Sequence, residues 1–408
     1  MGAALTPLWA RAAAAWLAAR LQRRVRGRLT LDLGALHSLA IGALRETAAA
    51  REGRIANMRI ASPRALRRAL LRGPTGLAES YLDGDWDTTD LDALLGFCMD
   101  NREALVTAGL GRLRLPRLAP VLGISRGNDP ARARRNAMAH YDLGNRFFAL
   151  WLDASMTYSC ALFAKAGDSL EAAQARKHTR VLDLIAARPG DSVLDIGCGW
   201  GAFLRAAAQR GLRAKGITLS RRQAEHILAS LNAGDACGQV GVALLDYRQT
   251  RGLYDRVVSI EMIEAVGERH WPDYFGSIGA RLRPGGVAVI QAITIADDLF
   301  PHYRRHSDFI ARFVFPGGML PTAARIERHG REAGLRLDHA ESFPASYALT
   351  IRHWRDRFRA NWTEIARLGF DERFRRLWEL YFAYCLAGFE NGTISVGLYC
   401  FIKPRRSA

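Results

Sequence analysis

The sequence predicts an α/β protein with an open, doubly wound and mostly parallel sheet, preceded by a smaller, largely helical N-terminal domain. From His140 onward, short apolar runs alternate with segments of helical spacing, as in parallel sheets covered by helices on both faces. In one such segment, Val193 to Gly201, an apolar run carries the acid Asp195 near its end, and three glycines follow at alternating positions. That order suits a buried strand that turns sharply into a helix beside a ligand. The arginine-rich N-terminal third lacks the alternation, which predicts a separate domain.

Positive charge is concentrated in the N-terminal third. Residues 1–135 hold 22 arginines against 12 acidic residues, a net +10 within a formal net charge of +18 for the chain. Such an excess attracts anionic partners, either nucleic acid or an anionic lipid surface. Ala12 to Ala19 is an apolar run between Arg11 and Arg20, too short to cross a bilayer. Two structures remain open for it: an interfacial helix on a membrane, or an alanine-rich helix packed on the protein.

Local signals organise the rest of the N-terminal part. Ser62 as N-cap and Pro63 at the first helical position predict a helix to Arg72, and 76–86 is expected to form a turn and an acidic loop. Leucine and arginine alternate around two prolines between 109 and 127, which favours a linker whose leucines could reach into lipid headgroups. We therefore expect a basic lipid- or membrane-binding domain at 1–108, a linker at 109–135 and a catalytic domain at 136–408.

The catalytic part divides into strands and helices in order. We expect strands at 192–197, 214–218, 242–246, 256–261 and 287–293, with helices at 202–210 and 221–232 between them. The C-terminal run 394–403 is strand-like and is expected to form an antiparallel edge strand. The six cysteines fall at irregular intervals without a C-x-x-C pair, so neither a disulfide framework nor a metal site is indicated.

The glycines of the strand-to-helix turn are spaced for a ligand without phosphates. Gly197, Gly199 and Gly201 alternate, whereas dinucleotide folds use G-x-G-x-x-G around a pyrophosphate. Preceded by Asp195, the segment resembles the first motif of S-adenosylmethionine (SAM) methyltransferases, whose loop wraps the amino-acid end of the cofactor. A glycine-rich turn without a ligand is the alternative.

Residues after the other strands are further candidates, because open parallel sheets bind ligands at the carboxyl ends of their strands. After the second strand, Thr218 and Gln223 offer neutral donors and acceptors where an acid usually grips the ribose hydroxyls. After the third, Asp246 could accept from the adenine amine while Tyr247 stacks beside the ring. The segment 259–267 after the fourth has two carboxylates and no proline. A nucleic-acid amino-methyltransferase would show Asn or Asp followed by two prolines there, so that class is disfavoured.

Several motifs stand in one order along the chain. They are Leu77–Gly84, His140-Tyr141-Asp142-Leu143-Gly144-Asn145, Tyr158-Ser159-Cys160, Val193–Gly201, Glu264, Phe315-Pro316-Gly317-Gly318 and Leu320-Pro321. This set closely resembles the cyclopropane-fatty-acyl-phospholipid synthases, which are similar in fold to the mycolic acid cyclopropane synthases. The resemblance covers roughly residues 57–403 and implies a seven-stranded class I SAM methyltransferase sheet.

The resemblance also implies a reaction. A cis double bond in a phospholipid acyl chain would attack the SAM methyl group, and the carbocation would lose a proton from the new methyl, closing a cyclopropane ring. An alkene is a weak nucleophile, so the site must align it with the methyl group and exclude water. The family uses bound bicarbonate as the base. Carried over to this sequence, the catalytic residues would be Cys160 and Ile293 through their backbones, Glu264, Tyr347 through its hydroxyl, Gln291 and Cys385.

Gln291 stands where the family commonly has a histidine. Glutamine donates a hydrogen bond to an anion but neither carries charge nor shuttles a proton, so bicarbonate dependence and ring closure are left open. For Cys385, a role in a helix core is favoured over one in the active site. Tyr158 and Ser159 are expected to touch the SAM carboxylate, and His140 to orient a lid over the cofactor or to cap a helix.

Three hypotheses follow. The leading one is cyclopropanation of unsaturated phospholipid acyl chains; the second is SAM-dependent C-methylation that leaves a methyl-branched or methylene chain. The third, from another class, is an idle membrane-binding protein that keeps the fold. SAM is the expected cofactor, with bicarbonate beside it. The expected partners are an anionic phospholipid membrane surface, at its cytoplasmic face, and the unsaturated phospholipid substrate, not nucleic acid; a homodimer is one of the oligomeric states left open.

Overall fold

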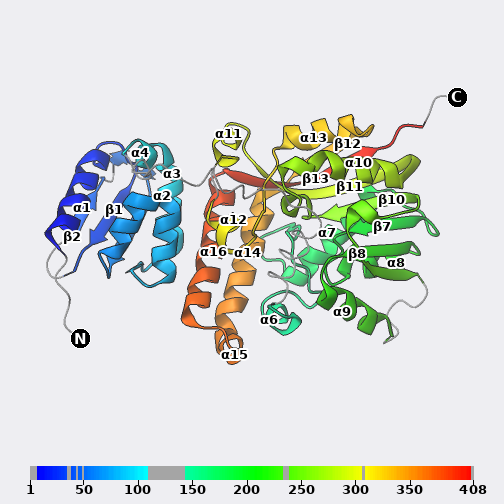
Figure 1. Ribbon diagram of the computed structural model, residues 1–408, viewed down its shortest axis with the longest axis horizontal. Coiled ribbons are helices and arrows are strands. Elements are labelled where there is room, and N and C mark those ends of the chain that lie inside the picture. Colours follow the sequence, from blue (N-terminus) through cyan, green and yellow to red (C-terminus); the bar gives the residue numbers. More distant parts are fainter. Residues whose placement is uncertain are drawn as a thin grey trace, which may run out of the picture. The chain divides into compact units, whose positions relative to one another are not determined.

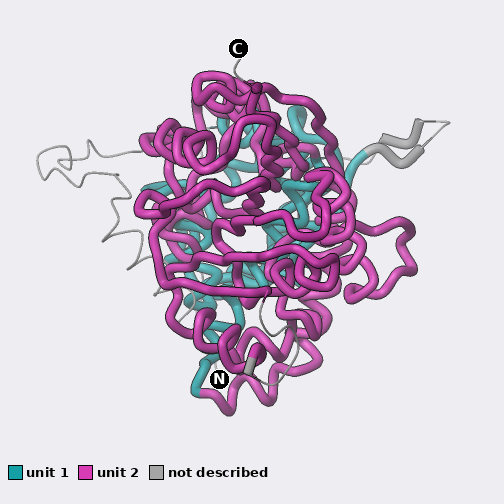
Figure 2. Tube along the Cα trace, turned by 90° about the vertical axis from the view of Figure 1, so that its right-hand side faces the viewer, with its two compact units in different colours: residues 1–124, 369–391 teal, residues 125–368, 392–408 magenta. Residues whose placement is uncertain are grey.

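The computed structural model describes residues 7–34, 38–42, 45–47, 50–108, 143–232, 239–305 and 308–405. The chain packs into two compact units, coloured separately in Figure 2. Unit 1 combines Met1–Ile124 with Gly369–Asn391, and unit 2 combines Ser125–Leu368 with Gly392–Ala408. The C-terminal segment 369–391 thus packs in unit 1, whereas the sequence placed everything from residue 136 onward in the catalytic domain. The expected linker, 109–135, lies outside the described residues.

Unit 2 is built on a seven-stranded sheet with the order β12-β13-β11-β10-β7-β8-β9 (Figure 1). Strands β7 to β12 run parallel, and β13 is antiparallel to both of its neighbours. The strands are β7 (Ser192–Ile196), β8 (Arg213–Thr218), β9 (Val240–Leu244), β10 (Tyr254–Ile260), β11 (Leu282–Ile295), β12 (Arg336–Ser342) and β13 (Ile394–Ile402). The doubly wound, mostly parallel sheet predicted from the sequence is therefore confirmed.

Strand β13 lies inside the sheet, so its predicted place at the edge is wrong. Every residue from Val396 to Phe401 is buried, as in a strand that is covered on both faces and paired on both sides. The edge strand is β12, which the sequence pattern did not predict. Its exposed side chains include Arg336, Asp338 and His339, and charged residues of this kind protect an open sheet edge from pairing with another chain.

Helices cover both faces of the sheet. The described helices of unit 2 are α6 (Asn145–Ala149), α7 (Leu170–Leu184), α8 (Ala202–Gln209), α9 (Arg221–Asn232), α10 (Trp271–Arg281), α11 (Phe300–Tyr303), α12 (Phe309–Phe313), α13 (Ala323–Glu332), α14 (Pro344–Ala360) and α15 (Trp362–Arg367), with 3-10 turns η1 (Tyr247–Gln249), η2 (Ile263–Ala265) and η3 (Glu268–His270). Neighbouring residues of β7 point to opposite faces: Leu194 joins an apolar cluster with α10 and α13, and Val193 one with α7, α8 and α9.

The strand order creates a switch point in the middle of the sheet. The chain leaves β7 for β8 on one side, and it leaves β10 for β11 on the other. Ligands of open α/β sheets bind beyond the carboxyl ends of the two strands that flank such a point. The loops after β7 and β10 are therefore where a site is expected.

Unit 1 carries a four-stranded sheet of order β2-β1-β5-β6 in addition to its helices. The strands are β1 (Arg28–Asp32), β2 (Ser38–Ile41), β5 (Ile55–Ile60) and β6 (Trp86–Asp87), with β3 (Arg45–Thr47) and β4 (Ala50–Glu52) in a separate hairpin; the helices are α1 (Leu8–Leu21), α2 (Arg64–Leu82), α3 (Leu91–Asp100), α4 (Arg102–Thr107) and α16 (Glu372–Glu390). This sheet is not among the elements predicted from the sequence. In the described ranges, no helix combines the length and apolarity that crossing a bilayer requires.

Helix α2 is kinked at Gly73, where φ is 61°. Its first part confirms the predicted helix to Arg72, but the turn predicted from Gly76 is wrong because the helix resumes and continues to Leu82. Pro74 suits the first turn of the second part, since a backbone N–H has no helical partner there. The acidic loop is thus confined to residues 83–85.

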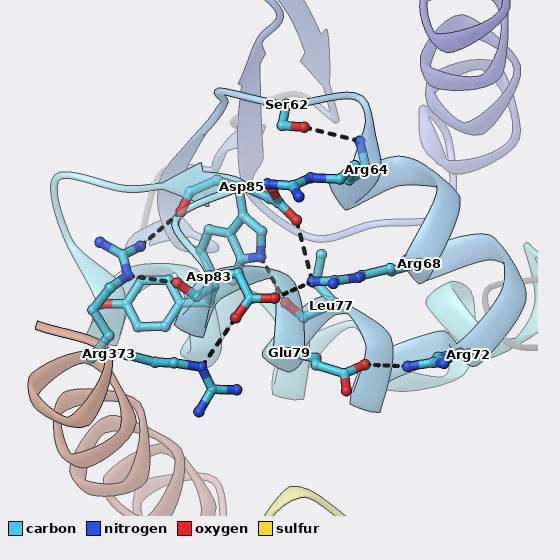
Figure 3. A network of polar contacts seen from close by, with 12 residues as sticks. Ser62, Arg64, Arg68, Arg72, Leu77, Glu79, Asp83, Asp85 and Arg373 are labelled. Carbon is cyan, nitrogen blue, oxygen red and sulfur yellow. Dashed lines mark hydrogen bonds and ion pairs between the residues drawn. The ribbon is translucent and has the colours of Figure 1, made fainter.

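Ion pairs join α2, the acidic loop and α16 within unit 1 (Figure 3). The Arg68 guanidinium lies 2.6 Å from the Asp83 carboxylate and 3.3 Å from that of Asp85. Arg373 of α16 contacts Asp83 from the other side at 3.1 Å. The Asp85 side chain is only 1% exposed, and Arg64, at 2.8 Å, joins Arg68 in supplying the partners that a buried carboxylate requires.

Candidate active site

The loop after β7 forms a cradle of three left-handed glycines. Gly197, Gly199 and Gly201 have φ values of 83°, 52° and 84°. A Cβ atom at Gly197 would lie 2.8 Å from the Met262 side chain, and one at Gly201 would lie 2.9 Å from Ile227, so both positions exclude a side chain. Beside Gly199 nothing lies within 4 Å of such an atom. The backbone at Gly199 is therefore open to a ligand.

Asp195, just before the glycines, is a buried acceptor in need of a donor. Its side chain is 2% exposed, and its Oδ1 has no hydrogen-bond partner. Burial raises the pKa of this carboxyl to about 7, and the charge of Lys177 opposes the shift. Buried carboxylates rarely lack a donor. An ammonium group such as that at the amino-acid end of SAM would supply one, so the cradle fits this cofactor.

The residues predicted to bind the ribose and adenine of the cofactor lie at the same edge of the sheet, after β8 and β9. Thr218 donates its hydroxyl to Gln223 Oε1 at 2.6 Å, and both side chains are buried. Asp246 is bound by Arg248, whose Nε and Nη2 lie 2.8 and 2.7 Å from its two oxygens. The Arg248 guanidinium also lies 5.0 Å from the centre of the Tyr247 ring. Arg248 was not among the residues predicted from the sequence. The cofactor contacts of the four residues that were, Thr218, Gln223, Asp246 and Tyr247, stay predictions.

Aromatic side chains surround Tyr158. Its ring centroid lies 5.2 Å from that of Trp151, 5.3 Å from that of Trp354 and 5.6 Å from that of Phe148. Asn145 accepts a 2.9 Å hydrogen bond from the indole of Trp200, which ties α6 to the glycine loop.

Two motifs of the resemblance, 143–145 and 158–160, are thus brought to the cofactor cradle. Ser159, predicted to touch the SAM carboxylate, is buried, and its hydroxyl accepts a 2.7 Å hydrogen bond from Lys177. His140 lies outside the described residues.

Glu261 is the centre of the polar cluster after β10. Its Oε1 accepts from the backbone N–H of Cys160 at 2.8 Å and from Gln291 Nε2 at 2.7 Å, and its Oε2 accepts from the Tyr347 hydroxyl at 2.6 Å. The backbone of Glu261 has a φ of 50°, in the left-handed region that favours glycine. Such a conformation costs a non-glycine residue about 1–3 kcal/mol. Backbone strain at this point indicates that the position of the carboxylate matters.

Glu264 lies one turn further along the chain, and its carboxyl group accepts fewer hydrogen bonds than that of Glu261. Its Oε1 accepts from the backbone N–H of Ile293 at 2.5 Å, and its Oε2 is buried without a partner. Burial and the neighbouring charge of Glu261 raise the pKa of Glu264 to about 8. Burial also raises the pKa of Glu261, but the hydrogen bonds from Tyr347 and Cys160 and the charge of Lys177 oppose that shift. The hydrogen bonds that hold Glu261 therefore make it the carboxyl of the pair that ionises first, while the proton is retained on Glu264.

Lys177 supplies positive charge to the site and was not among the residues predicted from the sequence. The side chain lies on α7 and is fully buried. Burial lowers its pKa to about 8, and the negative charges of Glu261, Asp153 and Asp195 oppose the shift. One signal was available: only four of the 58 basic residues are lysines, so a lysine inside a helix of the catalytic part stands out.

The structure assembles the donors that were predicted to hold bicarbonate, but they are already used. The backbone N–H of Cys160 and the hydroxyl of Tyr347 bind Glu261, and the backbone N–H of Ile293 binds Glu264. Gln291, in the place of the family's histidine, also binds Glu261. The residues present therefore do not fit a separate bicarbonate ion.

Two cysteines, Cys160 and Cys385, were among the predicted catalytic residues. Burial raises the pKa of the Cys160 thiol well above its usual range, which leaves its backbone N–H as the functional group. Cys385 lies on α16 in unit 1, and its role stays a prediction.

Residues 128–398 match the model of the mycolic acid cyclopropane synthetase family, about two thirds of the chain. The chain belongs to this family. Members are SAM-dependent methyltransferases, in agreement with the glycine cradle at the β7 switch point. A cyclopropane-fatty-acyl-phospholipid synthase of Escherichia coli K12 is 32% identical over 357 residues, 85% of this chain and 88% of that protein.

Two further similarities extend the comparison. A tuberculostearic acid methyltransferase of Mycobacterium tuberculosis is 40% identical over 410 residues, which cover 96% of this chain and 92% of that protein. The crystal structure of the mycolic acid cyclopropane synthase CmaA1, complexed with S-adenosylhomocysteine (SAH) and CTAB, is 29% identical, with a TM-score of 0.61 over 66% of this chain and 98% of that one. The family thus contains enzymes named for two different products.

Replacement of Lys177 by methionine should move the acid limb of the pH–activity profile to higher pH. Lys177 lowers the pKa of Glu261, so its removal raises that pKa, and Glu261 then ionises only at higher pH. We expect a shift of about one pH unit, with lower activity at neutral pH that recovers under alkaline conditions. The same substitution at the exposed Lys215 is the control. An unaltered profile in Lys177→Met would contradict the assigned electrostatic coupling.

Proposed function

We propose that this protein transfers a methyl group from SAM to a carbon of a cis double bond in unsaturated phospholipid acyl chains, and that Glu261 removes the proton that must then leave. The observation that carries the proposal is the Glu261 carboxylate, held by Cys160, Gln291 and Tyr347 beside the switch point of the sheet. It supplies from the chain itself a base at the position where the resemblance expects a captured anion.

The surroundings of Glu261 suit a base that works without water. Three donors fix the direction of the carboxylate, while burial raises its pKa and so its basicity. The protonated neighbour Glu264 does not compete for the proton. When bound, SAM supplies an electrophilic methyl group. The aromatic side chains around Tyr158 exclude water, which would otherwise capture a carbocation.

Two products can follow from the same first step. Once the methyl carbon has bonded to one olefinic carbon, the other carries the positive charge. Loss of a methyl proton with ring closure gives a cyclopropane. A hydride shift from the methylated carbon to the charged carbon, followed by loss of a methyl proton, gives a methylene branch. Glu261 would accept the proton from the same methyl group in both cases.

Of the two candidate products, we infer that the enzyme forms the methylene-branched chain and not the cyclopropane. The relative that matches 96% of this chain is named a methyltransferase, and Gln291 replaces the histidine expected of a bicarbonate-dependent site. The cyclopropane remains the second candidate, because the family model and the Escherichia coli relative are named for ring formation. We further propose a membrane phospholipid as substrate at the cytoplasmic face, which the net charge of +10 in residues 1–135 supports.

The test is expression in a bacterial host that lacks such an enzyme, fed with methyl-labelled methionine. Mass spectrometry of the phospholipids should show one labelled carbon added to unsaturated acyl chains and none to saturated chains. Proton NMR then separates olefinic methylene signals from the high-field signals of a ring. If every acyl chain keeps its mass, in the host and with purified protein, SAM and unsaturated bilayers, the proposal is wrong.

A further inference from the structure

Helix α1 packs on unit 1 through small residues alone along most of its length. Ala10, Ala14 and Ala18 are between 0% and 8% exposed, and Leu21 completes this face. The spacing of four residues places them on one side of the helix. One of the two structures left open for this segment, an alanine-rich helix packed on the protein, therefore describes one face of α1.

The opposite face of α1 is also apolar, and it is open to solvent. Leu8 is 85% exposed, Trp9 47% and Trp16 45%, and the exposed alanines Ala12 and Ala19 lie between them on the same side. Large apolar residues rarely gather on a helix face that remains in water, so such a face indicates a binding partner. We call Leu8, Trp9, Ala12, Trp16 and Ala19 the outer face of α1.

Cations follow the outer face immediately. Arg20 lies over the Trp16 ring, 4.7 Å from its centroid, and Arg23 and Arg24 are exposed in the turn that ends the helix. In the part of the chain that the structure describes, no acidic side chain forms an ion pair with these three arginines. Two arginines of α2 differ, because Arg68 and Arg72 are already paired with acids (Figure 3). The cluster beside α1 is therefore available to an anionic partner.

We propose that the outer face of α1 is the surface by which this protein docks on an anionic phospholipid bilayer. Tryptophan rings and leucine would enter the headgroup boundary, and Arg20, Arg23 and Arg24 would bind lipid phosphates above it. A second copy of the chain fits this face poorly, because a symmetric dimer would bring the same arginines of both copies together. The inference rests on the proposed function in one respect: a bilayer is where an unsaturated phospholipid substrate resides.

The experiment measures cosedimentation of the full-length protein with vesicles of phosphatidylcholine, alone or mixed with phosphatidylglycerol. The variant Trp9→Ser/Trp16→Ser should bind the mixed vesicles at least about tenfold more weakly than the parent. The variant Arg20→Glu/Arg23→Glu should lose the preference for mixed over neutral vesicles. Added salt should reduce the same preference in the parent. Leu253→Ser is the matched control, because Leu253 is an equally exposed apolar residue of unit 2, at 49%.

A second measurement, quenching of tryptophan fluorescence, reports contact with lipid even where the variant binds vesicles as tightly as the parent. Lipids brominated near the headgroup should quench more tryptophan fluorescence in the parent than in Trp9→Ser/Trp16→Ser. Equal binding and equal quenching in the parent and in Trp9→Ser/Trp16→Ser would overturn the proposal. So would a Trp9→Ser/Trp16→Ser protein that differs from the parent only in no longer forming a dimer. Turnover of unsaturated phospholipid dispersed in detergent keeps the two proposals apart. It should persist in Trp9→Ser/Trp16→Ser, whereas its absence from a parent that binds vesicles normally would count against the proposed function alone.

Discussion

Replacement of Glu261 by glutamine should lower the rate of methylation by about three orders of magnitude while SAM still binds. Glutamine has the same shape but accepts no proton, and its amide nitrogen would face donors that now bind a carboxylate. Product formation by the purified variant, with SAM affinity measured by calorimetry, tests the expectation.

Glu264→Gln is the matched control for this variant. Glu264 already holds its proton at neutral pH because burial and Glu261 raise its pKa to about 8. The amide resembles that neutral form and can still accept from Ile293, so we expect less than about a tenfold loss. Resemblance to the family alone would assign the larger loss to Glu264. A Glu264→Gln variant more damaged than Glu261→Gln would therefore restore Glu264 as the base.

The variant Glu261→Gly tests whether an added anion can replace the missing carboxylate. Glycine adopts a φ of 50° without strain, and the space left by the side chain would be lined by the donors of Cys160, Gln291 and Tyr347. Added bicarbonate or formate should restore part of the activity in proportion to its concentration. Chloride, which is no base, should not.

The second large effect is expected at Gly199. Alanine there should weaken SAM binding by at least about tenfold, because the Cβ atom would enter the open space beside the loop. Backbone strain also contributes, since φ at Gly199 is 52°. Calorimetric titration with SAM measures the affinity.

Gly190→Ala separates strain from occupied space. Gly190 also has a positive φ, 90°, and nothing lies within 4 Å of its added Cβ atom, but it precedes β7 at the opposite edge of the sheet. This variant should lose some stability and keep its affinity for SAM. Equal affinities in the two variants would show that the space beside Gly199 is not where the cofactor binds.

The sheet of unit 2 could be predicted where its strands are buried on both faces. Mostly apolar runs such as Val193 to Ile196, which Asp195 alone interrupts, lead into glycines and are distinctive even in a single sequence. The edge strand β12 escaped prediction because its side chains are mostly polar and exposed. The packing of 369–391 with unit 1 escaped for another reason, since contacts between segments about three hundred residues apart leave no local pattern.

The candidate site shows the same division. The glycine cradle and the two carboxylates after β10 follow from local sequence. The choice between those carboxylates does not, because it depends on Gln291 in β11 and Tyr347 in α14, which meet only after the sheet has formed. The left-handed backbone of Glu261 is likewise invisible in a sequence, since acids are not the residues expected in that conformation.

Unit 1 is built from two segments that most of unit 2 separates along the chain, and this sets the order in which it can mature during synthesis. Its sheet and α2 emerge from the ribosome before unit 2, whereas Arg376 of α16, which donates to the carbonyl oxygens of Tyr81 and Trp86, emerges after most of unit 2. In between, the ribosome translates most of the catalytic unit. Unit 1 therefore begins to be made before unit 2 and is completed only after most of unit 2 has been made.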